Sequence, residues 1–380
     1  MRRQRLSMDS IAPKRLLCLA ILACLANLSL NKLAAAAPVL VAVGEGGTMA
    51  RSTDLGKTWL PADSGGIKSL LVGATVARDS VLIAVGDEGT IARSLDKGAT
   101  WRAVSQSATH SMLYRAVVEP RGAVLAIGTN GAIVRSVDAG ATWSAMRSHT
   151  NSELHDVAVN RNGAVVVVGD NGALVRSVDG GATWSEQVSK TPDDFMSVVA
   201  TPSGAFVAVG LGGVIVRSAD DGATWSIDQQ EGELWSVTVE PKGALTTGAG
   251  EGVILRSADD GKSWSSQRAG ETCNSMVQAA TPDSVMLAAC DEGAIFRTED
   301  RGVTWTLAKF PWPATESYRR RLTITRLCVV TSKLIVGLGN RGTSNLTSAL
   351  VMSVDAGATW TELPATAATR HLVELLVVEP

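Results

Sequence analysis

Short apolar runs alternate with turn-forming segments through most of the chain after residue 38. In one representative unit, residues 111–148, three aliphatic runs are separated by the segments 119–122 and 128–131. These segments contain the glycine, asparagine and proline that favour tight turns between strands. A fourth run opens at Trp143. The pattern predicts units of four short antiparallel strands, each spanning about 40 residues.

The third turn of every unit carries the motif Ser-x-Asp-x-Gly-x-Thr-Trp, with conservative replacements at Ser263 and Thr298. Successive motif tryptophans are 42, 42, 41, 41, 39, 41 and 55 residues apart. The motif aspartates are Asp54, Asp96, Asp138, Asp179, Asp220, Asp259, Asp300 and Asp355. In such a turn, Asp accepts backbone hydrogen bonds, Gly adopts a positive φ and Trp buries a large apolar surface. We therefore interpret this Asp-box as structural and not catalytic.

Eight copies of a four-stranded unit predict an all-β fold, an eight-bladed β-propeller of four-stranded antiparallel blades, with a seven-bladed ring as the alternative. The first copy begins directly at its second strand, residues 39–43. The end of the chain, 370–380, resembles a first strand, so we expect the C-terminal strand to close the ring and hide the sheet edges. The long interval before Trp360 indicates an insertion at 309–321.

The first 36 residues have the features of a secretory signal peptide: basic residues, an apolar run at 16–30 and an alanine-rich segment ending near Ala36. The alternatives are an uncleaved membrane anchor or a lipoprotein processed at Cys24. We therefore expect a single propeller domain, residues 37–380, in the periplasm or outside the cell. Removing residues 1–36 leaves 29 basic and 36 acidic residues, an acidic balance that argues against a nucleic-acid partner.

The recurring string Gly-x-x-Gly-x-[Ile/Val/Leu]-x-Arg-[Ser/Thr]-x-Asp-x-Gly-x-Thr-Trp, as at 169–184, resembles the bacterial neuraminidase (BNR) repeat class. Within that class, residues 39–380 are most similar to the photosystem II stability and assembly factor family. The resemblance implies a non-enzymatic assembly factor that holds a membrane-protein partner through a basic surface. The eight repeats and the acidic mature charge differ from that family's usual seven blades and basic surface. The function expected from the sequence is thus that of a protein-binding scaffold or assembly factor. A membrane protein at the periplasmic face is one candidate for its protein partner.

The alternative function is that of a carbohydrate-binding or sialidase-like glycoside hydrolase propeller, with a glycan as the partner. Sialidases use three site arginines and a tyrosine nucleophile, whereas this chain has only Tyr114 and Tyr318. We therefore predict no glycosidase activity and no catalytic residues. The four histidines lack metal-ligand spacing, and no phosphate-binding loop precedes a helix, so neither a metal nor another cofactor is predicted.

Three sets of residues are candidates for partner binding. The first set is one arginine at the same register of each third strand, with Met352 replacing it in the last copy: Arg51, Arg93, Arg135, Arg176, Arg217, Arg256 and Arg297. A ring of guanidinium groups suits the carboxylates or phosphates of a partner. The alternative is that each arginine pairs locally and joins neighbouring blades.

The second set lies near the start of the first strand, where the repeats stop agreeing. Aligned on the turn that follows, this position reads Val72, Tyr114, His155, Met196, Trp235, Met276, Thr325 and Glu374. The next position adds Arg115, Asp156 and Arg326. First strands of propellers surround the central axis, where mixed polar and apolar groups are typical of ligand sites. The alternative is ordinary lining without a ligand.

The third set belongs to the insertion at 309–321, which carries Trp312, Tyr318 and three consecutive arginines. Aromatic and arginine side chains on loops are typical interface anchors, and a solvated insertion is the alternative. Cys273 and Cys290 flank a predicted hairpin turn nearly symmetrically, so they could form a disulfide; buried free thiols are the alternative.

Overall fold

The computed structural model describes residues 37–105, 108–270, 275–290, 293–310, 322–341 and 347–379. The predicted signal peptide and the loop residues Trp312 and Tyr318 lie outside these ranges, as does Cys273. Within the described ranges, no helix is long and apolar enough to cross a bilayer.

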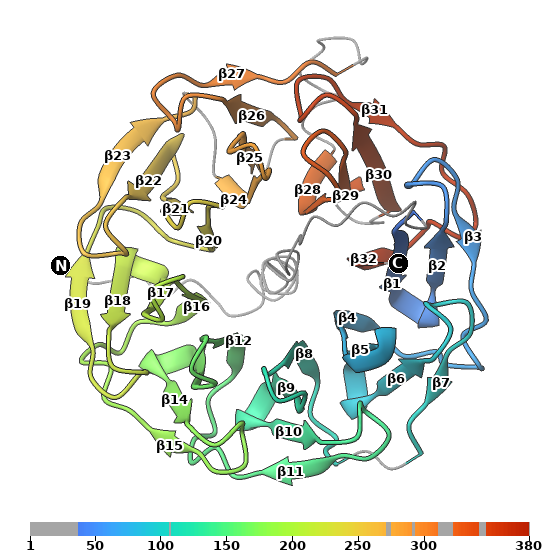
Figure 1. The fold of residues 1–380 in the computed structure, drawn as a ribbon, viewed down its shortest axis with the longest axis horizontal. Helices are drawn as coiled ribbons and strands as arrows, with labels where there is room; N and C mark the ends of the chain where they lie inside the picture. Colours follow the sequence, from blue (N-terminus) through green and yellow to red (C-terminus); the bar gives the residue numbers. More distant parts are fainter. Residues whose placement is uncertain are drawn as a thin grey trace, which may run out of the picture.

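Eight four-stranded antiparallel sheets are arranged as blades around a central axis (Figure 1). The innermost strands are β4 (Leu71–Val76), β8 (Leu113–Val118), β12 (Leu154–Val159), β16 (Phe195–Ala200), β20 (Val237–Val239), β24 (Ser275–Ala280), β28 (Leu322–Val329) and β32 (Leu372–Val378). The second strands are β1 (Val39–Gly44), β5 (Leu82–Gly86), β9 (Val124–Gly128), β13 (Val165–Gly169), β17 (Phe206–Gly210), β21 (Leu245–Gly248), β25 (Met286–Cys290) and β29 (Ile335–Arg341).

The two outer strands of each blade complete the sheets. The third strands are β2 (Met49–Ser52), β6 (Ile91–Ser94), β10 (Ile133–Ser136), β14 (Leu174–Ser177), β18 (Val214–Ser218), β22 (Val253–Ser257), β26 (Ile295–Thr298) and β30 (Thr347–Ser353). The outermost strands are β3 (Leu60–Pro61), β7 (Arg102–Ala103), β11 (Ser144–Met146), β15 (Ser185–Glu186), β19 (Ser226–Gln229), β23 (Ser265–Arg268), β27 (Thr306–Leu307) and β31 (Thr361–Glu362).

The C-terminal strand closes the ring, as the sequence predicted. β32 pairs antiparallel with β1, from Val39 opposite Val378 to Val43 opposite Glu374. Blade 1 therefore consists of β32, β1, β2 and β3, and blades 2–8 follow in chain order. The eight-bladed architecture is confirmed, and the seven-bladed alternative is wrong.

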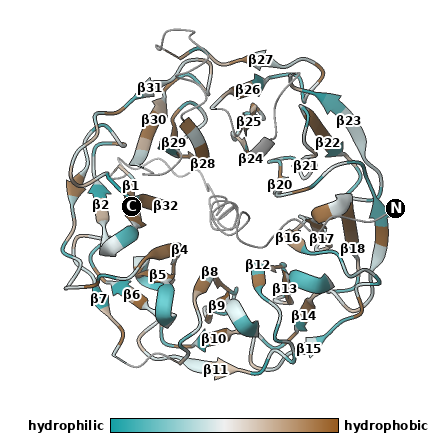
Figure 2. Cartoon of the chain, turned by 180° about the vertical axis from the view of Figure 1, so that it is seen from behind, coloured by the Kyte–Doolittle hydropathy of each residue, from teal (hydrophilic) through white to brown (hydrophobic). Residues whose placement is uncertain are grey.

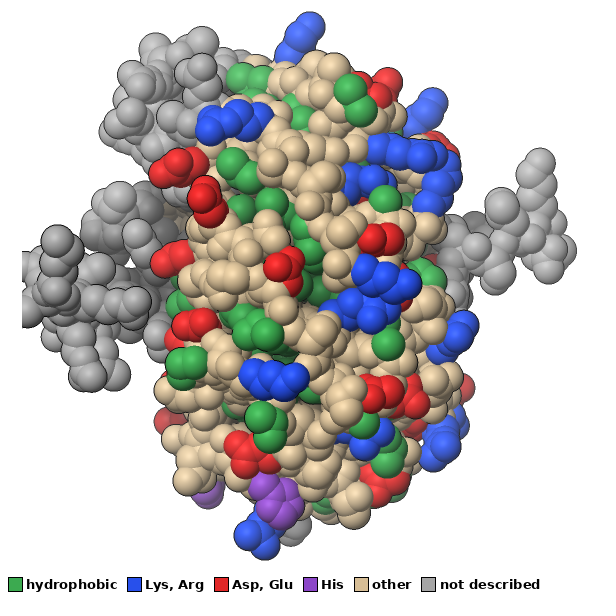
Figure 3. Space-filling view, turned by 90° about the vertical axis from the view of Figure 1, so that its left-hand side faces the viewer, with side chains coloured by type: hydrophobic (Ala, Val, Ile, Leu, Met, Phe, Trp, Pro, Cys, Tyr) green, Lys and Arg blue, Asp and Glu red, His purple; other side chains and the backbone are tan. Residues whose placement is uncertain are grey.

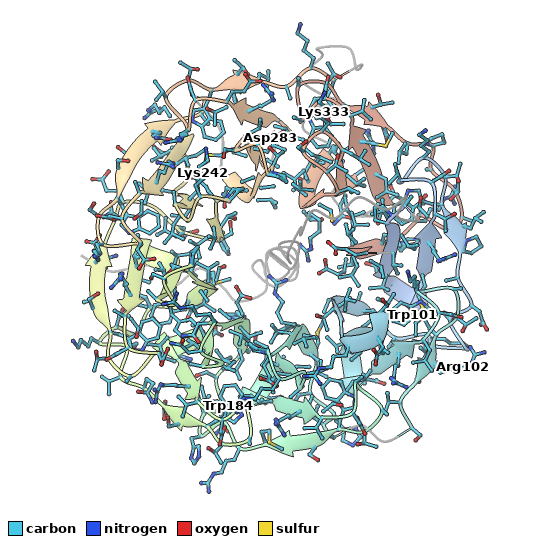
Figure 4. The ribbon with its side chains drawn as sticks, in the orientation of Figure 1. Trp101, Arg102, Trp184, Lys242, Asp283 and Lys333 are labelled. Carbon is cyan, nitrogen blue, oxygen red and sulfur yellow. The ribbon has the colours of Figure 1, made fainter. Side chains whose placement is uncertain are left out.

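The core lies between blades, because each second strand is covered on both faces by its neighbours. All six residues of β1 and all five of β5 are buried, whereas both residues of β3 are exposed. Trp101, a motif tryptophan with no exposed surface that Figure 4 labels, belongs to the apolar cluster between blades 1 and 2 that also contains Val41 and Leu82. Colouring by hydropathy shows apolar residues along the strands and hydrophilic residues in many of the connecting turns (Figure 2).

Short 3-10 turns connect the second and third strands of several blades. They are η2 (Glu45–Gly47), η4 (Asp87–Gly89), η5 (Thr129–Gly131), η6 (Asp170–Gly172) and η7 (Leu211–Gly213), while η3 (Arg78–Ser80) joins β4 to β5. Because the innermost strand begins beside the end of the second strand, these turns lie at the same end of the ring as the starts of the innermost strands. We call this end of the ring the η face.

The Asp-box turns lie at the opposite end of the third strands and have the hydrogen bonds expected of a structural motif. In blade 3, Ser136 Oγ donates to Asp138 Oδ1 (2.7 Å), while the backbone N–H and the hydroxyl of Thr142 donate to Asp138 at 2.9 and 2.6 Å. Trp143 Nε1 donates to the carbonyl of Gly140 (3.1 Å). Burial raises the pKa of Asp138, but the bonds from Thr142 and Ser136 outweigh it and bring that pKa to about 2.

One cysteine of the described chain takes part in a disulfide bond. Cys290, at the end of β25, is disulfide-bonded. Cys328 is buried in β28. Cys273, which the sequence offered as a bridging partner, is one of the residues that the structure does not describe.

Candidate functional site

The repeated arginines of the third strands join each blade to the next. Six of them donate a hydrogen bond from Nε to a backbone carbonyl in the next blade's Asp-box turn. The pairs are Arg51 to Lys97 (2.9 Å), Arg93 to Ala139 (2.8 Å), Arg135 to Gly180 (2.8 Å), Arg176 to Asp221 (2.6 Å), Arg217 to Asp260 (2.7 Å) and Arg297 to Ala356 (2.8 Å). Each acceptor residue has a positive φ. This backbone conformation aims its carbonyl at the preceding blade.

Two blades depart from this arrangement. Arg256 instead forms a two-pronged ion pair with Glu240 of its own blade, at 2.7 and 2.8 Å. Met352 of blade 8 packs in an apolar cluster with Leu55 of blade 1. The contacts therefore correspond to the interblade alternative considered from the sequence. Binding of a partner by these arginines stays a prediction.

The divergent positions at the starts of the innermost strands are β-bulges. In the pairing with the second strand, Val72, Tyr114, His155, Met196, Met276 and Thr325 each fall where the register shifts. In blade 1 the bulged residue is Val373, so the sequence alignment that placed Glu374 in this series was wrong by one position. That alignment started from Pro380, and β32 is one residue longer before its proline than β8. A bulge turns one side chain out of the regular alternation, so these positions can differ without disturbing the ladder.

Trp235 lies just before its strand, because β20 begins at Val237. Its side chain is half-buried. The bulged Tyr114, Met196 and Val72 are buried, with Tyr114 and Val72 in one apolar cluster.

The residues that follow the bulges form polar contacts between neighbouring innermost strands. Arg115 Nε lies 3.4 Å from Asp156 Oδ1, and Asp156 also accepts hydrogen bonds from Ser197 Oγ and the backbone N–H of Val198, both at 3.0 Å. Burial raises the pKa of Asp156 despite the nearby Arg115.

A second buried pair joins the last blade to the first. Arg326 Nε lies 3.2 Å from Glu374 Oε1, and each residue is only 7% exposed. The predicted site residues Arg115, Asp156 and Arg326 thus lie inside the wall of the ring, where they connect blades.

Two carboxylates and one imidazole lie close together at the η face of blade 4. Glu153 directly precedes β12, His155 is its bulged residue, and Asp170 opens η6. His155 Nε2 lies 2.5 Å from Asp170 Oδ1, and one potential ligand atom from each of the three side chains lies within 4.8 Å of the others. His155 is 1% exposed, and its Nδ1 has no hydrogen-bond partner in the described part of the chain.

Blade 3 contributes to the surroundings of this group. The hydroxyl of Tyr114 donates to Glu153 Oε2 (3.3 Å), and the rings of Tyr114 and His155 lie 6.3 Å apart. The predicted Tyr114 and His155 therefore come together, while Glu153 and Asp170 were missed. Histidine spacing alone could not find them, because Asp170 reaches His155 only across the β12–β13 hairpin, while Glu153 lies two residues before His155. The signal was the Glu-x-His sequence followed by Asp at the next turn.

The turns between second and third strands at the η face are acidic. Exposed carboxylates occur in them at Glu45, Asp87, Glu88 and Glu251, and η2, η4, η5, η6, η7 and the turn at 249–252 contain no Lys or Arg. Seen from the side, the ring has most of its Lys and Arg side chains in the right half, whereas acidic side chains occur along the left-hand margin and in the right half as well (Figure 3).

Comparison with known proteins agrees with this architecture. A family model described as photosynthesis system II assembly factor YCF48 matches residues 135–234. The chain resembles this assembly-factor family. No curated protein matches the sequence. The matched segment extends from the third strand of blade 3 to the start of blade 6 and includes Glu153, His155 and Asp170.

Similar solved structures include YCF48 propellers and a lyase. YCF48 bound to D1 peptide has a TM-score of 0.57 at 16% identity, over 86% of this chain and 99% of that one. YCF48 from Cyanidioschyzon merolae gives 0.54 at 16% identity, over 76% and 95%. Virginiamycin B lyase from Staphylococcus aureus gives 0.56 at 12% identity, over 70% and 90%. At these identities the likeness establishes the propeller fold alone.

Proposed function

We propose that this protein is a non-enzymatic binding scaffold or assembly factor for a protein partner, and that the partner docks on the η face. The observation that carries the proposal is the match of the assembly-factor family to residues 135–234. This segment contains the η-face ends of blades 4 and 5, including the bulged residues His155 and Met196. The matched segment also contains the Asp-boxes of Asp179 and Asp220, so the choice of the η face rests on the divergence of the repeats there.

The chemistry of the η face suggests what part of the partner it receives. A related propeller, YCF48, has been solved with a D1 peptide bound. The acidic turns of this chain suit an extended segment that carries Lys or Arg, and they would repel nucleic acid. We propose that the partner is a membrane protein that presents such a segment at the periplasmic face.

The proposed location is the periplasm or the cell exterior. The signal-peptide-like segment at 1–36 supports it, and so does the disulfide-bonded Cys290, because disulfides persist in oxidising compartments.

A purely binding role is preferred to catalysis. The lyase propellers share the fold, and a shared fold does not carry an activity with it. The repeated aspartates, which suggest sialidases, are occupied by hydrogen bonds within their own turns. A glycan-binding propeller is the competing outcome of the experiment below.

Site-specific photo-crosslinking in the native cell envelope tests the proposal. A photoreactive amino acid replaces Asp87, which is exposed on the η face, and a matched variant carries it at Val137, which is 68% exposed in an Asp-box turn. We expect one protein adduct from position 87 and none from position 137, with no signal on a glycan array. Adducts confined to position 137, or glycan binding without any protein adduct, would overturn the proposal.

A further inference from the structure

We infer that Glu153, His155 and Asp170 bind a divalent transition-metal cation at the η face of blade 4. The inference goes beyond the proposed function and does not depend on it. The three side chains offer one imidazole nitrogen and two carboxylates, with ligand atoms within 4.8 Å of one another. No ligand set of this kind is needed to form a blade, because four other blades with the same described backbone contact fold without it.

The repeat itself shows that this combination is special to blade 4. In each of five blades, the first residue of the turn after the second strand donates its backbone N–H to the carbonyl of the residue two positions before the bulge, at 2.8 or 2.9 Å. These hydrogen bonds place the same three positions together every time. The same three positions hold other residues in the other four blades. They are Leu70, Val72 and Asp87 in blade 2; Met112, Tyr114 and Thr129 in blade 3; Asp194, Met196 and Leu211 in blade 5; and His371, Val373 and Glu45 in blade 1.

Among these five blades, blade 4 alone has a potential metal ligand at all three positions. The backbone therefore supplies the geometry everywhere, and the substitutions Glu153, His155 and Asp170 supply the donors once. Blade 1 comes nearest, with His371 Nδ1 lying 3.2 Å from Glu45 Oε2, but Val373 occupies its third position.

The environment of His155 restricts how its imidazole can bind a ligand. The ring is almost fully buried, and its Nε2 lies 2.5 Å from Asp170 Oδ1, so Nε2 is the nitrogen that faces this carboxylate. A cation would take the place of this direct contact and be coordinated by both atoms.

The donor set defines the class of cation. Mixed imidazole and carboxylate ligands suit Zn²⁺ and similar first-row ions, whereas Ca²⁺ prefers sites made of oxygen alone. Three protein ligands leave at least one coordination position open. Because the Asp170 side chain is 15% exposed, that position can be reached from the η face.

Isothermal titration with Zn²⁺ tests the inference, using tag-free protein treated with a chelator. We expect one equivalent to bind, and we expect His155→Ala and Asp170→Asn each to weaken binding at least about tenfold. The matched control is His371→Ala, which removes a histidine from the same region of blade 1 and should leave the affinity unchanged. Ca²⁺ should not compete.

Circular dichroism of each variant separates a lost ligand from a lost fold, and the near-isosteric Asp170→Asn keeps the turn intact. Absence of one-equivalent Zn²⁺ binding to the folded wild type, or equal affinity in the folded wild type, His155→Ala and Asp170→Asn proteins, would overturn the inference. Neither result would affect the photo-crosslinking outcome, so the two proposals fail separately.

Discussion

Replacing two arginines of the same register by methionine should destabilise the propeller by different amounts. Methionine is a matched substitution, because Met352 occupies this register naturally in blade 8. Arg135→Met removes one charge-assisted hydrogen bond to the carbonyl of Gly180, worth about 1.5–3 kcal/mol. Arg256→Met removes both hydrogen bonds to Glu240, whose carboxylate is only 5% exposed. Leaving that charge unpaired should cost about 3–5 kcal/mol.

The assay is equilibrium unfolding in urea, with the folded fraction followed by tryptophan fluorescence. Arg256→Met should have the lower midpoint, and adding Glu240→Gln should recover part of the loss because the buried group is then neutral. Equal midpoints for Arg135→Met and Arg256→Met, or no recovery in the double variant, would refute the assignment of two different roles to one repeated residue.

Three further predictions concern the closure of the ring and the Asp-boxes. Truncation after Thr369 removes β32 with its buried leucines and valine. The lost burial is worth about 6–12 kcal/mol, which approaches the whole free energy of unfolding of a domain. The truncated protein should therefore elute only as aggregates on size-exclusion chromatography. Glu374→Ala leaves Arg326 buried without its carboxylate and should lower the melting temperature measured by calorimetry, whereas a surface control, Glu88→Ala, should not. The pKa of Asp138 is lowered from 3.8 to about 2, so its stabilising contribution is complete above about pH 4 and is lost as the pH falls toward 2; Asp138→Asn should reduce the pH dependence of the unfolding midpoint across that interval, and an unchanged slope would contradict the lowered pKa.

The fold could be predicted from the sequence because its defining contacts are local. The Asp-box bonds join residues at most four positions apart, such as Asp138 and Thr142, so the motif can be read directly. Closure by the C-terminal strand followed from a missing first strand in the first repeat. The alignment failed only at Glu374, because strand length before the final proline varies by one residue and a bulge moves the register.

The candidate site was only partly predictable because its contacts depend on register between strands and between blades. Arg115 and Asp156 were both identified, but their pairing across two blades became visible only when the innermost strands were placed side by side. Glu153, His155 and Asp170 come together only because β12 pairs with β13 and His155 is bulged in that pairing. The sequence places Glu153 and His155 close together, but its spacing does not show that Asp170 joins them.

Binding of a protein partner to the η face can be measured by hydrogen–deuterium exchange of the complex with the cross-linked partner. The measurement compares the backbone amides of η4, η5 and η6 with those of the Asp-box turns. We expect slower exchange in Asp87–Gly89, Thr129–Gly131 and Asp170–Gly172 on binding, and unchanged exchange in the Asp-box turns. Protection confined to the Asp-box turns would contradict binding at the η face.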